Sequence, residues 1–247
     1  MKKGFVLILL VLLTSVTVFA KGKYSENDIG KIVLKSGKLV SAENYDRASF
    51  EAIAIIYKVS EDGTYCFGVG IHTKRAQWAP EGTYGSLSRI KGLENLKDGS
   101  KAFDIIRKTD PEGFRNLKEN YPALYFASNY GKIYNVGKYA DGWYVPTLDE
   151  SPSRLSWNWS GDGPERWGKV SAAWEICTGE ELFFDSWCSD SRWLKNDYDS
   201  WWGGYFYDDV PADIEFSLQN LGIVGESGAS PHCNWDKYEV LVVRKFN

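Results

Sequence analysis

The chain has 247 residues, which allows one large domain or two small ones, and its 43% hydrophobic and 25% charged content is typical of globular proteins. The net charge of −4 gives no reason to expect nucleic-acid binding, which needs a basic patch. The aromatic content is unusual, because 11 Trp and 15 Tyr accompany a single Met.

The first 20 residues have the layout of a secretory signal peptide. Two lysines follow Met1, an apolar stretch runs from Phe5 to Leu13, and small residues precede a cleavage site after Ala20. Since the apolar part is shorter than the ~20 residues that span a membrane comfortably, we expect no stable membrane insertion after cleavage. The mature protein is expected in the periplasm, on the cell surface or outside the cell. Residues 21–30 are polar and predicted to be flexible.

The next elements are predicted to be strands. Ile32–Leu34 and Leu39–Val40 form a small hairpin, and the Ile- and Ala-rich stretch Ala52–Val59 is a buried strand. A turn returns the chain as a strand over Thr64–His72. Gly68 and Gly70 within that strand indicate close packing over it or a bulge.

Three helices are predicted further along. Asp98 or Ser100 can cap a helix that runs through Lys108. Proline suits the first turn of a helix, so Pro111 and Pro122 predict two more.

The stretch 139–150 is predicted to be the centre of the domain. Asp141–Gly142 is a turn signal, Trp143–Val145 favours a short strand, and Pro146 limits its length. Thr147 and Glu150 have the spacing of a capping box, which opens a helix. The sequence therefore predicts a turn, a strand, a proline and a helix at the middle of an α+β domain.

Gly142–Glu150 also resembles the signature of bacterial surface domains such as the C-terminal domain of the collagen-like adhesin Lcl. Three further stretches fit the same pattern in order: Tyr121–Ala127, Ser186–Ser191 and Val242–Phe246. The resemblance covers residues 31–247 and implies a single domain with a C-type-lectin-like fold. Such a domain has small antiparallel sheets, flanking helices, and ligand sites on long loops before the last strands.

The sequence departs from this pattern after Glu150, where Ser151–Ser153 interrupts the expected helix. That helix is therefore short or displaced downstream. Residues 165–178 are predicted to be helical and closed by Gly179, with an apolar stripe of Val170, Ala173, Trp174 and Cys177. Tyr238–Phe246 is predicted to be a central strand that is covered on both faces.

The aromatic residues of 157–209 lie among Ser, Asp, Asn and Gly rather than in apolar runs. An exposed Trp offers a flat apolar face with a polar edge, which suits sugars and protein surfaces, although some of these rings could instead fill the core beneath loops. The candidate ligand-binding residues are Trp157, Trp159, Trp193, Trp201, Trp202 and Tyr205, with the acidic neighbours Asp197, Asp199 and Asp208. They indicate a non-catalytic, adhesin-like protein that binds a glycan or an extracellular protein.

Two other function classes remain open. The acidic run from Asp197 to Glu215 could supply the paired carboxylates of a glycoside hydrolase, or it could bind calcium. Its spacing matches no EF-hand loop, and a solvated acidic face is the simpler interpretation. A structural envelope protein that binds copies of itself is the third class. His72 and His232 lack a nucleophile motif beside them, so we predict no catalytic residue, metal site or cofactor.

Four cysteines in an exported protein allow disulfides. Cys188 and Cys233 are the candidate pair, because both lie in the loop-rich C-terminal half. Cys66 on a strand and Cys177 on a helix could equally be free buried thiols.

Overall fold

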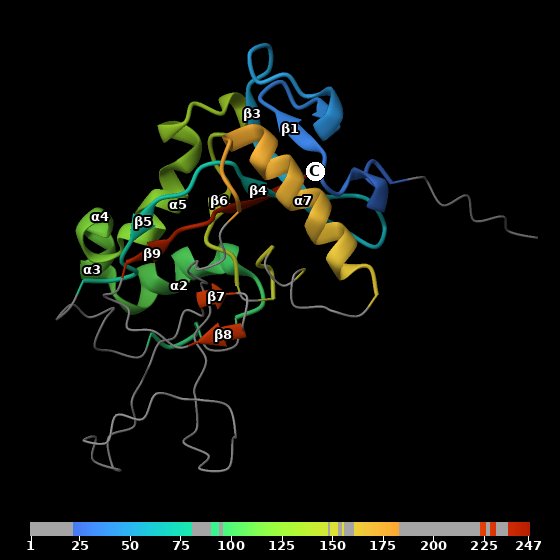
Figure 1. The fold of residues 1–247 in the computed structure, drawn as a ribbon. Helices are drawn as coiled ribbons and strands as arrows, with labels where there is room; N and C mark the ends of the chain where they lie inside the picture. The colour runs from blue at the N-terminus through green and yellow to red at the C-terminus, as the bar shows by residue number, and fades with distance from the viewer. Residues whose placement is uncertain are drawn as a thin grey trace, which may run out of the picture.

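The structure is a computed structural model that describes residues 22–80, 90–93, 96–147, 149–152, 155, 161–182, 223–225, 228–230 and 237–247. Its centre is an antiparallel sheet of six strands in the order β2-β1-β3-β4-β10-β6 (Figure 1). These strands are β1 (Ile32–Leu34), β2 (Leu39–Val40), β3 (Ala52–Val59), β4 (Cys66–Gly70), β6 (Trp143–Tyr144) and β10 (Val243–Phe246). The last strand in the chain is thus inserted between β4 and β6.

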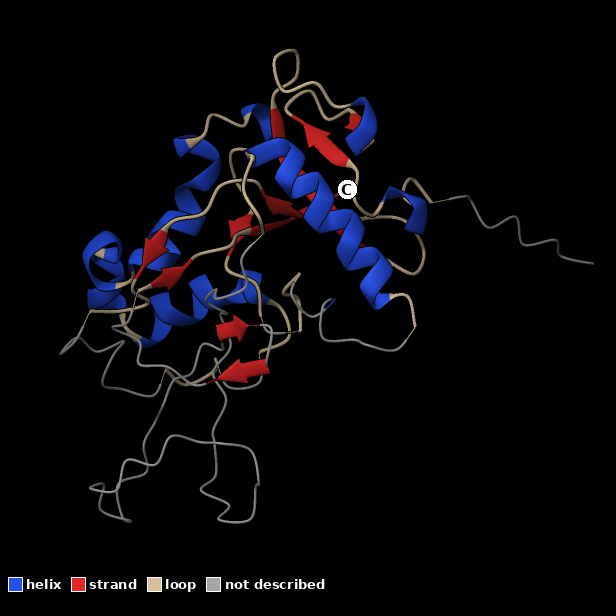
Figure 2. Ribbon diagram, viewed as in Figure 1, coloured by secondary structure: helices blue, strands red, loops and turns tan. Residues whose placement is uncertain are grey.

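Helices surround this sheet (Figure 2). The α-helices are α2 (Ala102–Thr109), α3 (Pro111–Arg115), α4 (Leu117–Asn120), α5 (Pro122–Ile133) and α7 (Gly163–Thr178). Short 3-10 helices are η1 (Glu26–Asp28), η2 (Ala42–Asn44), η3 (Gly99–Lys101) and η4 (Gly137–Tyr139). Two ribbons complete the described elements, β5 (Arg75–Ala76) with β9 (Tyr238–Glu239) and β7 (Ile223–Gly225) with β8 (Gly228–Ser230).

The α+β class and the antiparallel pairing are as predicted. The central sheet is larger than the small sheets that the resemblance implied, because the chain's final strand joins two earlier segments. The likeness to C-type lectins remains a prediction.

Local sequence signals explain where the helices begin. The side chain of Asp98 accepts a hydrogen bond from the backbone N–H of Ser100, as a helix cap does. Asp110 caps α3 in the same way by accepting from the N–H of Gly113 at 2.9 Å. Pro111 and Pro122 stand in the first turns of α3 and α5, as predicted.

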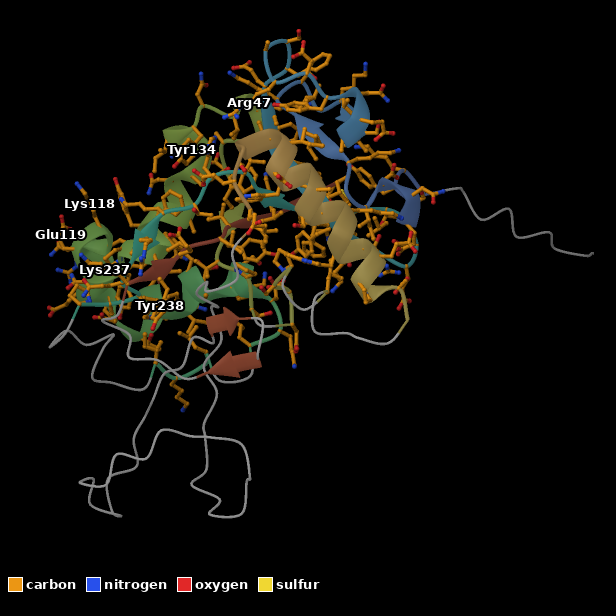
Figure 3. All side chains as sticks on the ribbon, in the orientation of Figure 1. Arg47, Lys118, Glu119, Tyr134, Lys237 and Tyr238 are labelled. Atoms are coloured by element: carbon orange, nitrogen blue, oxygen red, sulfur yellow. The ribbon has the colours of Figure 1, made fainter. Side chains whose placement is uncertain are left out.

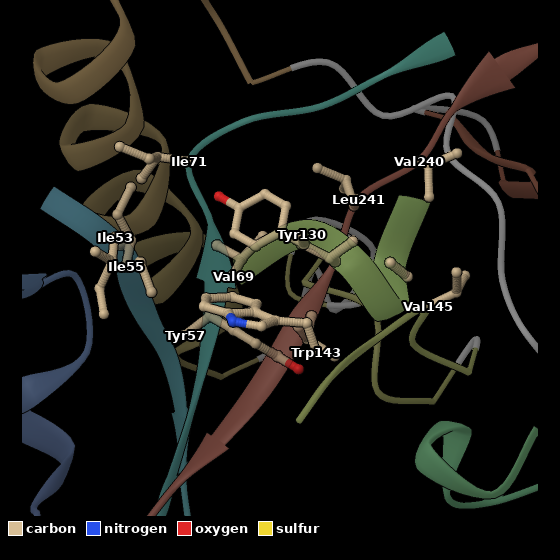
Figure 4. Close-up of a cluster of buried hydrophobic side chains, with 14 of the residues drawn as sticks. Ile53, Ile55, Tyr57, Val69, Ile71, Tyr130, Trp143, Val145, Val240 and Leu241 are labelled. Carbon is tan, nitrogen blue, oxygen red and sulfur yellow. The ribbon is translucent and has the colours of Figure 1, made fainter. Parts of the chain in front are cut away.

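The core lies on and around β3 and β4 (Figure 4). Helix α7 contacts β3, and α5 packs on the sheet through Tyr130. A Cβ added to Gly70 would lie 2.7 Å from the Tyr130 ring and 2.9 Å from Val242. Gly70 is therefore a close-packing position, because any larger residue would push α5 off the sheet.

The predicted strand Tyr238–Phe246 is interrupted, which corrects the sequence analysis. Its first part, β9, pairs with β5, and its second part, β10, pairs with β4 and β6. β4 belongs to the six-stranded sheet and β5 to a separate two-stranded one. A segment that pairs with both of them must therefore pass from one sheet to the other. The predicted burial is still correct, since Val240 and Val242 have no exposed surface.

The expected flexible N-terminal segment is also corrected, for residues 22–30. Tyr24 and Ile29 are buried in the core. The N–H of Tyr24 donates to the carbonyl of Gly63 at 2.9 Å, and the N–H of Gly30 donates to the carbonyl of Ile56 at 2.8 Å. This polar stretch therefore contributes two apolar side chains to the core and is hydrogen-bonded to Gly63 and to β3.

Glu150 connects the predicted central stretch to its surroundings. Its carboxylate accepts hydrogen bonds from the N–H groups of Gly99 (2.9 Å) and Thr147 (3.0 Å) and from the Tyr144 hydroxyl (3.1 Å). Its carbonyl accepts from the Tyr57 hydroxyl at 2.7 Å. The carboxylate therefore joins β6, η3 and the loop after β6, a role that a capping box alone would not have.

Downstream of this stretch the structure describes a helical Leu155 and then the helix α7. Its predicted apolar stripe is buried, with Trp174 only 5% exposed. Gly179 ends α7 in the left-handed conformation with φ of 79°. The prediction of this helix and its end is confirmed.

Candidate functional site

All nine candidate ligand residues lie outside the described residues. The same is true of the signal peptide and of the candidate disulfide between Cys188 and Cys233. The structure neither brings these side chains together nor separates them, and their role remains a prediction.

The structure does describe the chain on either side of the segment that contains seven of the nine. Leu182, the last described residue before that segment, lines a cleft of about 290 Å³. Tyr238, which comes after this segment and after β7 and β8 in the sequence, lines the same cleft and lies on β9 (Figure 3). The remaining lining residues are Thr73, Arg75, Trp174, Glu180, Glu181 and Glu239. Leu182 and Tyr238, one before and one after the seven candidates in the sequence, therefore lie at one concave surface.

Trp157 and Trp159 are attached elsewhere. They precede α7, whereas the other seven candidates follow it. A helix of 16 residues is about 24 Å long at 1.5 Å per residue. In the chain, two of the candidates therefore come before the start of α7 and seven come after its end, which is the end that borders the cleft.

Two local features build the cleft. Gly179 ends α7, and the next turn is held by Thr178, whose hydroxyl donates to the carbonyl of Trp174 at 2.9 Å and accepts from the N–H of Glu180 at 3.1 Å. Opposite this turn, Arg75 of β5 pairs directly with Glu239 of β9. The end of a helix and a two-stranded ribbon thus form the two walls.

The lining of the cleft is more apolar than polar, and its charged groups have an acidic excess. Glu180, Glu181 and Glu239 supply three carboxylates against the one guanidinium of Arg75, which donates to the carbonyl of Lys237 at 2.9 Å. Carboxylates accept hydrogen bonds from hydroxyl and ammonium groups. The volume is at the lower end of the range for small-molecule pockets, so the cleft can hold one sugar ring or a side chain rather than a whole large ligand.

The described histidine and the described acidic residues can be examined for acid–base and metal chemistry. His72 stacks on Tyr134 with 4.0 Å between ring centroids, and burial lowers the pKa of its imidazole. Within the described ranges, no group of three or more His, Cys, Asp or Glu could hold a metal ion.

The described cysteines, Cys66 and Cys177, are free and buried, as one of the two interpretations predicted. Burial raises the pKa of each thiol to about 12. Neither thiol is therefore activated as a nucleophile, since reactivity depends on the thiolate.

The fold is similar to that of a bacterial fimbrial protein. That protein comes from Bacteroides ovatus ATCC 8483, and the match has a TM-score of 0.54 at 10% sequence identity. The match covers 87% of this chain and 48% of the fimbrial protein, so the chain spans about half of that protein's length. At this identity the likeness concerns the fold alone.

Comparisons of sequence gave no relative. No family model matches the chain, and neither does any curated protein. The resemblance to the Lcl C-terminal domain therefore stays a prediction. Among the described residues, none of the helices is both long and apolar enough to cross a membrane.

Sequence reasoning missed the residues that line the cleft. Arg75 and Glu239 are 164 positions apart, and no spacing or motif connects them. Glu180 and Glu181 directly follow the predicted helix end at Gly179, which marks them as surface residues but not as part of a site. Only the pairing of β5 with β9 brings these charges together.

Proposed function

We propose that the protein is a non-catalytic binding protein of the bacterial cell surface. It recognises a glycan or an extracellular protein through the aromatic residues between Trp193 and Tyr205, together with the cleft that Leu182 and Tyr238 line. The observation that carries the proposal is that Leu182 and Tyr238, which stand before and after this segment in the sequence, line one cleft. A fold shared with a fimbrial protein and a secretory leader support the location at the surface.

The two parts supply complementary interactions. Trp193, Trp201 and Trp202 offer large apolar faces, and binding energy usually concentrates in a few such side chains. The carboxylates of Glu180 and Glu239 accept hydrogen bonds from hydroxyl groups of a ligand that enters the cleft. A sugar presents both apolar C–H faces and hydroxyl groups, so a glycan is the ligand that uses all of these groups.

The test is a screen of the mature chain, starting at Lys21, against a glycan array, with release of reducing sugar measured on every glycan that binds. Glu239→Gln is expected to weaken binding to a hit roughly tenfold, which corresponds to one hydrogen bond to a charged group. Glu165→Gln is the matched control, because Glu165 is exposed on α7 and pairs with Lys169. Trp201→Ala is expected to cost ~2 kcal/mol or more of binding energy with little change in melting temperature.

Other outcomes would contradict the proposal in identifiable ways. Release of reducing sugar would establish the hydrolase. Self-association without any ligand would favour the structural envelope protein. If every loss of affinity is accompanied by a loss of folding, the tryptophans belong to the core. The proposal takes residues 31–247 as one domain with residues 22–30 packed on it, which predicts a single unfolding transition.

A further inference from the structure

A row of three side chains crosses one end of the central sheet. Lys58 of β3 pairs directly with Phe67 of β4, and Phe67 pairs directly with Lys245 of β10. Directly paired residues project from the same face of a sheet, so two lysines flank one phenylalanine ring. Neighbouring strands lie about 4.8 Å apart, which puts the two lysine Cα atoms roughly 10 Å from each other.

The ammonium groups of Lys58 and Lys245 each lie over an aromatic ring. Lys245 Nζ lies 3.5 Å from the centre of the Tyr65 ring, and Lys58 Nζ lies 5.8 Å from the centre of the Phe67 ring. The two rings meet edge to face with 5.5 Å between centroids. A cation within about 6 Å of a ring centre is attracted by it. The lysines are therefore positioned without a carboxylate.

These positive charges are uncompensated within the part of the chain that the structure describes. Both lysines are exposed, and none of the ion pairs formed among the described residues includes either of them. The N–H donors of each ammonium group therefore remain available to an anion. The chain as a whole carries a net charge of −4, so this patch has the opposite sign to the molecule.

On this face of the sheet, the side chains change from buried to exposed at the row of Lys58, Phe67 and Lys245. Val69 and Val243, two positions along from Phe67 and Lys245, are completely buried. Phe67 and Tyr65 are only partly buried. The rings consequently offer apolar surface next to the ammonium groups.

We propose that Lys58, Tyr65, Phe67 and Lys245 form a second binding surface, and that its ligand is a carboxylated polysaccharide. Such a chain repeats carboxylates that can meet both lysines, and its sugar rings present C–H groups that can contact the part-exposed aromatic rings. An acidic peptide meets the charges but supplies no such ring contact. This surface is built from β3, β4 and β10 and shares no residue with the cleft, so it goes beyond the function proposed above.

The test uses the full mature chain and polygalacturonate as the probe, at low ionic strength. The uncharged control ligand is the methyl ester of the same polymer. We expect polygalacturonate to bind and its methyl ester not to bind. The double variant Lys58→Gln, Lys245→Gln is expected to lose roughly tenfold in affinity, the sum of two exposed charge pairs. Added salt should weaken binding of the unmodified chain more than that of the double variant.

Matched variants separate a specific surface from general charge. Lys108 and Lys118 are exposed lysines on α2 and α4, so Lys108→Gln, Lys118→Gln removes the same charge elsewhere and should leave binding unchanged. Phe67→Leu should weaken binding while the salt dependence persists, because it removes the ring and keeps both lysines. Melting temperatures of all variants are measured alongside.

Several results would overturn the proposal. The first is that polygalacturonate does not bind, and the second is that its methyl ester binds equally well. The third is that the Lys108→Gln, Lys118→Gln control loses as much affinity as the Lys58→Gln, Lys245→Gln variant. Tighter binding of polyglutamate, or of vesicles that contain phosphatidylglycerol, would assign the surface to an acidic protein or a membrane instead. A loss of binding in Trp201→Ala would move the site to the segment after α7. That last result also distinguishes this surface from the function proposed above.

Discussion

Replacing Glu150 by alanine tests how the central stretch is held. The carboxylate accepts from the buried N–H groups of Gly99 and Thr147, at 2.9 and 3.0 Å. Each buried donor left without an acceptor costs about 1–3 kcal/mol, so the two together should lower the free energy of unfolding by about 4 kcal/mol. For a domain of this size, that corresponds to a melting temperature lower by roughly 10 °C.

Glu150→Gln is the control for this prediction. One oxygen of the glutamine still accepts from both N–H groups, and its amide nitrogen can donate to the Tyr144 hydroxyl, which lies 3.1 Å from the present carboxylate. We expect a loss of about 1 kcal/mol for this variant. Urea denaturation measures both losses, and hydrogen exchange at residues 99–102 should show local opening in the alanine variant. If both variants stay within about 0.5 kcal/mol of the unmodified chain, Glu150 does not connect these elements.

Three further predictions concern the core and the leader. Trp143 is 4% exposed, so Trp143→Ala should cost ~3–5 kcal/mol and Trp143→Phe less, and a denaturant midpoint that hardly moves would show that the ring is not a core group. Burial raises the pKa of Cys66 and Cys177 to about 12, so a thiol reagent at mildly alkaline pH should modify them only after unfolding, and fast reaction of the native protein would refute this. Sequencing of exported protein should begin at Lys21, and a leader retained in the membrane fraction would contradict cleavage.

Signals within a few residues of one another determined much of the fold. The Ile-rich run over β3 was predicted with the bounds that the structure has, and its side chains from Ile53 to Tyr57 and at Val59 are all buried. The caps at Asp98 and Asp110 and the prolines at the starts of α3 and α5 act within one helical turn. Local hydrogen bonding and φ restriction require no knowledge of the rest of the chain.

Contacts between distant segments were decided by the tertiary structure alone. The backbone N–H of Tyr24 bonds to the carbonyl of Gly63, 39 positions later, and the last strand is divided because β4 and β5, its two partners, belong to different sheets. The cleft exists because β5 and β9, more than 160 positions apart, pair beside the end of α7. The row of Lys58, Phe67 and Lys245 likewise follows from the register of three strands, since a shift by one residue would move each side chain to the other face. Amino-acid types specified what each segment prefers locally, whereas the register and order of the strands decided which charges and rings meet.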